Sequence, residues 1–300
     1  MSKGNYARLN QEQLKDRRAI FMDLADAPIT TKIAYSQRLI SKALEIGKPA
    51  LLYSGGRDST VLMHLVRQQA PAVTVIHNDT TLGDPAALDF VRQMTTGTNY
   101  IETTAADPWK MWERTGYYPI CAKRTFLKYK HAIPGLRIQP IACCYNLKAI
   151  YSNRVMKTDC TQVAFWGNRA AESNRRLLHF LDHGFLFKPQ QSKWFQCYPL
   201  QHWTDADIDA YLKDYVPTFA RGKGFETGCL VCMTDIQKMP NNASRLYDNN
   251  RPLWEKAMLG GFGAEILKMQ GIQEPTPHML QETLRLSPKA LLKIGRLKNE

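Results

Sequence analysis

The segment Ser54-Gly55-Gly56-Arg57-Asp58-Ser59 constrains the fold more than any other part of this 300-residue sequence. It follows residues 50–53, an apolar run typical of a buried strand, and precedes helical apolar spacing over residues 60–69. Two glycines between a strand and a helix predict a tight turn with positive φ, in which backbone N–H groups converge on an anion. The helix dipole favours the same anion. The sequence therefore predicts a phosphate-binding strand–loop–helix unit.

The side chains of this loop fit the same interpretation. Ser54 and Ser59 can donate hydroxyl hydrogen bonds, and Arg57 can bind a phosphate bidentately. Asp58 either takes part in the chemistry or stabilises the loop. An ordinary tight turn with a serine cap is the alternative, which six residues in this order disfavour. The loop is not a Walker A motif, because GxxxxGK(S/T) does not occur in this region.

Strand and helix patterns alternate beyond the loop. Further strands are predicted over residues 73–77, 100–103 and 163–166, with a helix over 85–94. Alternation with short connections predicts an α/β fold with a doubly wound, mostly parallel sheet and helical additions at both ends. Ligands of such sheets bind beyond the carboxyl ends of the strands.

The same patterns predict the domain organisation. We expect a helical N-terminal segment over residues 1–48, a phosphate-loop domain over 49–235 and a helical, basic C-terminal region over 236–300. No run of about 18 apolar residues occurs, so no membrane partner is expected. The N-terminus leads into a polar stretch, and a cytoplasmic location is therefore the expectation.

The charge of the chain points to an anionic partner. It has 40 Lys+Arg against 27 Asp+Glu, a formal net charge of +13. Such an excess attracts polyanions through long-range fields and counterion release. The alternative is that the basic residues only surround a phosphate site and form a solvated surface. Such a site rarely requires so large an excess of Lys and Arg over Asp and Glu. We expect a nucleic-acid partner, DNA or RNA.

The seven cysteines fall into two groups. An odd count without a secretion signal disfavours a disulfide framework. Two local pairs suit a 4Fe–4S cluster or a structural zinc, although adjacent cysteines are awkward for tetrahedral zinc; buried, inert thiols are the third possibility. The pairs are Cys143-Cys144 and Cys229-x-x-Cys232, whereas Cys121, Cys160 and Cys197 are interpreted as structural.

The loop resembles the SGG(K/R)DS pyrophosphate loop of a family that contains the phosphoadenosine-phosphosulfate (PAPS) reductases and the N-type ATP pyrophosphatases. Four later segments agree in order. Asp79-Thr80 resembles the family's Asp-Thr motif, residues 167–176 resemble GxRxxESxxR, residues 199–208 resemble P(L/I)xxWTxxD, and residues 228–232 match GCxxC.

This resemblance implies an adenine nucleotide α-hydrolase-like fold and a set of site residues. Asp79 would hold Mg²⁺ or contact the ribose or base, with a helix cap as the alternative. Glu172 would orient an arginine or begin a helix. The implied nucleotide-binding residues are Ser54, Gly55, Gly56, Arg57, Asp58, Ser59, Asp79, Thr80, Gly167, Arg169, Glu172 and Ser173. The implied catalytic residues are Arg57, Asp58, Arg169 and Arg176.

The cysteine pattern resembles the iron–sulfur ligands of adenosine-phosphosulfate (APS) reductases and of DNA-sulfur-modification enzymes. It implies a 4Fe–4S cluster on Cys143, Cys144, Cys229 and Cys232.

Two chemistries are compatible with the family. An ATP pyrophosphatase would use Mg²⁺ to adenylate an acceptor, DNA or tRNA, and sulfur from a donor protein would then displace AMP. A sulfonucleotide reductase would attack the sulfur of PAPS or APS with a cysteine thiolate, which such enzymes carry in a C-terminal tail. No cysteine follows Cys232, so we expect the pyrophosphatase. A third possibility is a non-catalytic binding module, because Arg57 stands where many relatives have lysine.

Overall fold

The computed structural model describes residues 11–108, 110, 144–216, 218–219, 228–230 and 250–253. The chain divides into two compact units. The first unit comprises Met1–His77, Met94–Ile101 and Arg154–Ala220, and the second comprises Asn78–Gln93, Glu102–Asn153 and Arg221–Glu300. The domain boundaries expected at residues 48/49 and 235/236 stay predictions.

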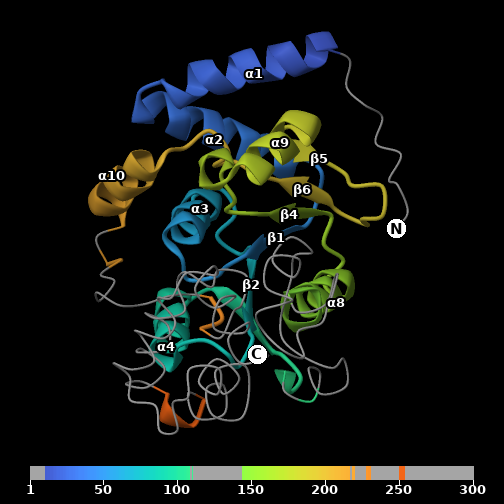
Figure 1. Ribbon diagram of the computed structural model, residues 1–300, viewed down its shortest axis with the longest axis vertical. Helices are drawn as coiled ribbons and strands as arrows, with labels where there is room; N and C mark the ends of the chain where they lie inside the picture. The colour runs from blue at the N-terminus through green and yellow to red at the C-terminus, as the bar shows by residue number, and fades with distance from the viewer. Residues whose placement is uncertain are drawn as a thin grey trace, which may run out of the picture. The chain divides into compact units, whose positions relative to one another are not determined.

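A mostly parallel sheet organises the fold, as predicted (Figure 1). The strand order is β3-β2-β1-β4-β6-β5. β1 pairs in parallel with β2 and β4, and β4 pairs in parallel with β6, whereas β5 is antiparallel to β6. The strands are β1 (Pro49–Leu52), β2 (Thr74–Asp79), β3 (Asn99–Thr104), β4 (Val163–Phe165), β5 (Leu186–Phe187) and β6 (Phe195–Cys197).

The helices before residue 95 lie where the sequence predicts them, whereas the helices over residues 150–158 and 174–183 were not predicted. The helix expected from residue 60 starts three residues earlier, because Gly56 takes the N-cap position in an extended conformation. The helices are α1 (Gln11–Ala25), α2 (Ile29–Leu44), α3 (Arg57–Arg67), α4 (Pro85–Met94), α8 (Ile150–Thr158), α9 (Asn174–His183) and α10 (Asp205–Tyr215). A π-helical turn, η1 (Tyr145–Ala149), and a 3₁₀ turn, η2 (Ala170–Glu172), complete them. None of the helices in the described part of the chain is long and apolar enough to cross a membrane.

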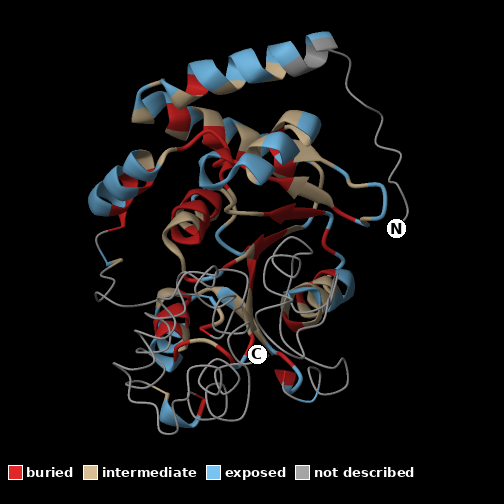
Figure 2. Ribbon diagram, viewed as in Figure 1, coloured by how far each residue is buried: buried red, intermediate tan, exposed pale blue. Residues whose placement is uncertain are grey.

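The central strands are buried on both faces, as the doubly wound arrangement requires. Successive side chains of a strand point to opposite faces. Leu51 is fully buried on one face, and its neighbours Ala50 and Leu52 belong to the other. Figure 2 shows β4 and α3 as mostly buried and α1 as mostly exposed, and the two central residues of β1 are buried.

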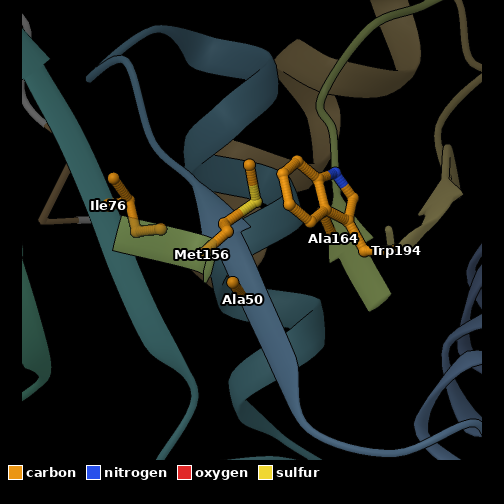
Figure 3. Packing of buried hydrophobic residues seen from close by; sticks show 5 residues of the cluster. All are labelled: Ala50, Ile76, Met156, Ala164 and Trp194. Atoms are coloured by element: carbon orange, nitrogen blue, oxygen red, sulfur yellow. The ribbon is translucent and has the colours of Figure 1, made fainter. Parts of the chain in front are cut away.

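One apolar cluster shows how small residues let other elements approach the sheet (Figure 3). Ala50 of β1 and Ala164 of β4 are register partners, and neither is exposed to solvent. Met156 of α8 and the indole of Trp194 pack on them, together with Ile76. Close packing of this kind stabilises the strand ends from which the loops emerge.

The segment before α10 is fixed by polar contacts with α2. Ser36 Oγ donates to the Pro199 carbonyl at 2.9 Å and accepts from Trp203 Nε1 at 3.0 Å. Lys32 Nζ lies 2.6 Å from Asp207 Oδ2, and both side chains are largely buried. These contacts set the point at which α10 begins.

Thr204 followed by Asp205-Ala206-Asp207 is a sequence pattern that predicts a capped helix start, and α10 begins in this way. The Thr204 side chain accepts from Asp207 N, and the Asp207 side chain accepts from Thr204 N in return. The neighbouring His202 is buried, which lowers the pKa of its imidazole to about 4, with the backbone of Lys32 offsetting part of the shift. This histidine is therefore neutral at pH 7.

Candidate functional site

The phosphate loop lies between β1 and α3, and hydrogen bonds within the loop hold its turn. Gly55 has φ +77°, in the left-handed region that favours glycine, as predicted, whereas Gly56 is extended with φ −74°. The Ser54 and Ser59 hydroxyls lie 3.0 Å apart, and Gly56 N donates to Ser54 Oγ at 3.3 Å. Ser59 Oγ donates to the Gly56 carbonyl at 3.0 Å. The loop therefore presents a preformed turn at the positive end of the α3 dipole.

Gly167 contributes to this site through the space it leaves open. It follows β4, and a Cβ at this position would lie 3.1 Å from both N and Cα of Ser59 and 3.3 Å from the Asp58 carbonyl carbon. All three atoms belong to the backbone of the first turn of α3. The structure thus gives the motif glycine a packing role that a sequence pattern does not reveal.

Arg169 is surrounded by protein groups. Its side chain is 3% exposed, and its Nε lies 3.1 Å from Asp58 Oδ1, an ion pair in which the N–H does not point at the oxygen. Nη1 donates to the Trp203 carbonyl at 3.3 Å, and Nη2 donates to Asp205 Oδ1 at 2.8 Å. Every nitrogen of this guanidinium therefore contacts the protein, an arrangement suited to holding Asp58 and the loop in place.

Arg57 is directed at α10. Its Nη2 lies 2.9 Å from Asp205 Oδ1, and its Nη1 lies 2.5 Å from Asp209 Oδ1. Burial disfavours its charge, but Asp209, with Asp205 and Asp58, raises the pKa of Arg57 above its usual range. Sequence reasoning missed both α10 carboxylates. The available signal was their i, i+4 spacing, which places them on one helix face.

Arg176 and Glu172 form the other polar part of the site. Glu172 Oε2 accepts from Arg169 N at 2.8 Å and forms an ion pair with Arg176. Ser173 caps α9 by accepting from Arg176 N at 3.3 Å. Burial and the charge of Arg169 lower the pKa of Arg176, whereas Asp58 acts in the opposite direction. Arg57, Arg169 and Arg176 thus each have a carboxylate partner in this part of the structure.

In the second unit, the structure brings two of the predicted motifs together. Cys229 Sγ donates to Thr80 Oγ1 at 3.2 Å. Leu230 N donates to the Leu82 carbonyl at 2.8 Å. The Asp-Thr and Gly-Cys segments therefore pack against each other, although 149 residues separate Thr80 from Cys229.

Asp79 is the last residue of β2, two residues beyond the end predicted for this strand. Its Oδ1 accepts from Thr81 N at 2.7 Å. This turn orients the carboxylate and leaves Oδ2 as a candidate ligand for a hard cation.

The structure describes two of the four predicted cluster ligands. Cys144 is exposed, and Cys229 is half-buried. Cys143 and Cys232 lie outside the described residues, as does Cys121. Within the described ranges, no three His, Cys, Asp or Glu side chains are grouped as a metal site.

A phosphate loop at the carboxyl end of β1, followed directly by α3, defines a nucleotide-binding α/β protein. The family model described as "phosphoadenosine phosphosulfate reductase domain" matches residues 48–232. The chain therefore belongs to the PAPS reductase family, whose members are enzymes that act on nucleotides.

Three of the solved structures that match the chain have low sequence identity to it. The PAPS reductase of Candida auris, solved as a phosphate complex, is 13% identical with a TM-score of 0.43, over 74% of this chain and 98% of that chain. The U34-tRNA thiolase of Methanococcus maripaludis, solved with its 4Fe–4S cluster, is 16% identical with a TM-score of 0.39, over 75% and 80%. The NH3-dependent NAD synthetase of Campylobacter jejuni is 11% identical with a TM-score of 0.45, over 83% and 99%. A search of the curated proteins gives no significant match.

Proposed function

We propose that the chain is an ATP pyrophosphatase that activates an acceptor for sulfur transfer. The observation that carries this proposal is the preformed loop, with Gly55 at positive φ directly before α3, in a family of nucleotide enzymes. An acceptor oxygen would attack the α-phosphorus, and the bond from that phosphorus to the bridging oxygen would break. The electron pair of that bond would leave with pyrophosphate, whose charge the loop stabilises.

The side chains have distinct expected roles. The hydroxyls of Ser54 and Ser59, which lie 3.0 Å apart, would donate to phosphate oxygens. Arg57 and Arg176 would supply positive charge, because each keeps part of its side chain exposed to solvent. Arg169 would hold Asp58 and the loop. Asp79 offers the oxygen donors that Mg²⁺ prefers, and a bound Mg²⁺ would neutralise the phosphate charge.

The acceptor is proposed to be a nucleic acid, DNA or tRNA. The net charge of +13 suits a polyanion better than a small sulfonucleotide. A sulfur nucleophile, delivered by a donor protein, would attack the acceptor atom that bears the adenylated oxygen. The bond from that atom to the oxygen would break, and the oxygen would leave as part of AMP while sulfur takes its place.

A sulfonucleotide reductase that releases sulfite is the second candidate, favoured by the description of the matching family. It requires a cysteine thiolate as nucleophile. Burial raises the pKa of Cys197 far above its usual range, so this thiol would stay protonated and unreactive. Among the described cysteines, Cys197 is therefore unsuited to that role.

Anaerobic turnover with separate nucleotides distinguishes the candidates. We expect the protein to release pyrophosphate and AMP from ATP and Mg²⁺, with a higher rate when tRNA or DNA is added. Ser54→Ala combined with Arg57→Ala should reduce this activity at least about a hundredfold, since two ligands of the phosphates are lost. Sulfite release from PAPS or APS with ATP unchanged would instead establish the reductase. Binding of ATP without any turnover would favour the non-catalytic module.

The cysteine cluster is a separate proposal. Cys143, Cys144, Cys229 and Cys232 are proposed to hold a 4Fe–4S cluster. Anaerobically purified protein should be brown, with broad absorption at the blue end of the spectrum and about four irons per chain. Cys229→Ser should remove the colour, whereas Cys160→Ser, an exposed cysteine outside the motifs, should retain it. A colourless protein with one zinc per chain would contradict the cluster.

A further inference from the structure

The acidic first turn of α10 places one carboxylate between two arginines of the site. Asp205 Oδ1 accepts from Arg57 Nη2 at 2.9 Å and from Arg169 Nη2 at 2.8 Å, so a single oxygen atom joins both guanidinium groups. Asp58, the loop residue after Arg57, pairs with the Nε of Arg169. Positive and negative side chains therefore alternate along Arg57, Asp205, Arg169 and Asp58.

The two arginines differ in how firmly they are held. Arg169 is 3% exposed and has a protein partner at each nitrogen, so its position is fixed. The Arg57 side chain is 36% exposed, and its partners Asp205 and Asp209 are 68% and 60% exposed. Exposed ion pairs of this kind are weak and exchange easily. The position of Arg57 is therefore set by charge and not by packing.

Without a negative charge between them, the two guanidinium groups would repel each other. The hydrogen bond and the charge of Arg169 hold the pKa of Asp205 below its usual range, so this carboxylate is ionised at neutral pH. If Asp205 were neutral, the ion pair that Arg57 keeps among the described residues would be with Asp209, one helical turn further along α10, and Arg57 would withdraw from Arg169.

We propose that Asp205 is a positioning residue that holds the Arg57 guanidinium beside Arg169, where both support binding of the nucleotide phosphates. The inference rests on the proposed function, because it takes Arg57 as a phosphate ligand. It adds a residue that lies outside the phosphate loop and outside the motif arginines.

The test uses Asp205→Asn, which removes the charge and keeps the shape. The Kd for ATP with Mg²⁺, measured by calorimetry on the full chain, should rise about tenfold, the effect of losing one charge-assisted hydrogen bond. KM should rise in parallel, with kcat within about twofold of wild type. Asp205→Glu should restore binding, and in an Arg57→Ala background Asp205→Asn should have no further effect.

Asp214→Asn is the matched control. Asp214 is an exposed residue of α10, has no ion pair among the described residues, and its loss changes the net charge by the same amount. Removing a negative charge makes the protein more positive, which by itself would strengthen the binding of an anion. Weaker binding by Asp205→Asn therefore cannot result from the change in net charge. Equal or tighter binding by Asp205→Asn would overturn the inference.

Nucleotide binding by the wild type distinguishes a failure of this inference from a failure of the proposed function. Wild-type binding of PAPS but not ATP would refute the pyrophosphatase, and the Asp205 comparison would then be made with PAPS and the same tenfold expectation. Wild-type binding of neither nucleotide would refute both.

Discussion

Gly167→Val is expected to reduce nucleotide affinity and turnover about a hundredfold, because it would displace the phosphate loop. Any Cβ at this position lies 3.1 Å from the backbone of Ser59 and 3.3 Å from that of Asp58. Backbone at the start of a helix cannot move aside as a flexible side chain can. The variant should also lose about 2 kcal/mol of unfolding free energy, the usual range for overpacking. Calorimetric titration with nucleotide and urea unfolding would measure the two effects.

Gly83→Ala serves as the control for this change. A Cβ at Gly83 would lie 3.6 Å from the Gly228 carbonyl oxygen, an ordinary contact. This variant should retain nucleotide binding and stability, and Gly167→Ala should show a smaller loss than Gly167→Val. Wild-type affinity in Gly167→Val would show that the first turn of α3 adapts and that the close approach is unimportant.

Asp207→Ala should cause the largest loss of stability, about 4 kcal/mol in the free energy of unfolding at pH 7. Lys32 is 2% exposed and would be left as a buried charge without its carboxylate partner. The helix would also lose the bond from Thr204 N to Asp207. Urea unfolding at constant pH measures this effect.

The pH dependence of the same pair gives a second measurement. Burial alone would raise the pKa of Asp207, but the hydrogen bonds from Lys32 and Thr204 lower it below its usual range. A depressed folded-state pKa contributes stability above the unfolded pKa of about 3.9, and this stability is lost as the pH falls through the folded pKa. The wild type should therefore lose this contribution below about pH 4, and Asp207→Ala should not.

Two further variants test the cause of the loss. Lys32→Met combined with Asp207→Leu should recover much of the stability, because no unpaired buried charge remains. Asp214→Asn, on the exposed part of the same helix, should change the stability by less than about 0.5 kcal/mol. A loss below about 1 kcal/mol in Asp207→Ala would contradict the importance of the buried pair.

The sequence alone predicted the features that depend on local order. The glycines of the loop, the strand before it and the helix after it follow from spacing and backbone freedom, and so does the Thr204 cap of α10. Strand–helix alternation predicted the mostly parallel sheet for the same reason. The two short strands β5 and β6 were missed, because two or three residues carry no periodic signal and such strands form only when a neighbour is present.

Only the tertiary structure decided which charges meet. The sequence indicates only that Asp205 is an acidic residue in the first turn of a helix. The packing of α10 on α3 brings Asp205 into contact with Arg57 and Arg169. The sequence identifies Gly167 as part of a motif. Its close approach to Ser59, however, depends on how β4 lies beside β1. Hydrogen bonds and ion pairs of this kind join residues far apart in the chain. Their geometry depends on packing between elements, which local sequence patterns do not encode.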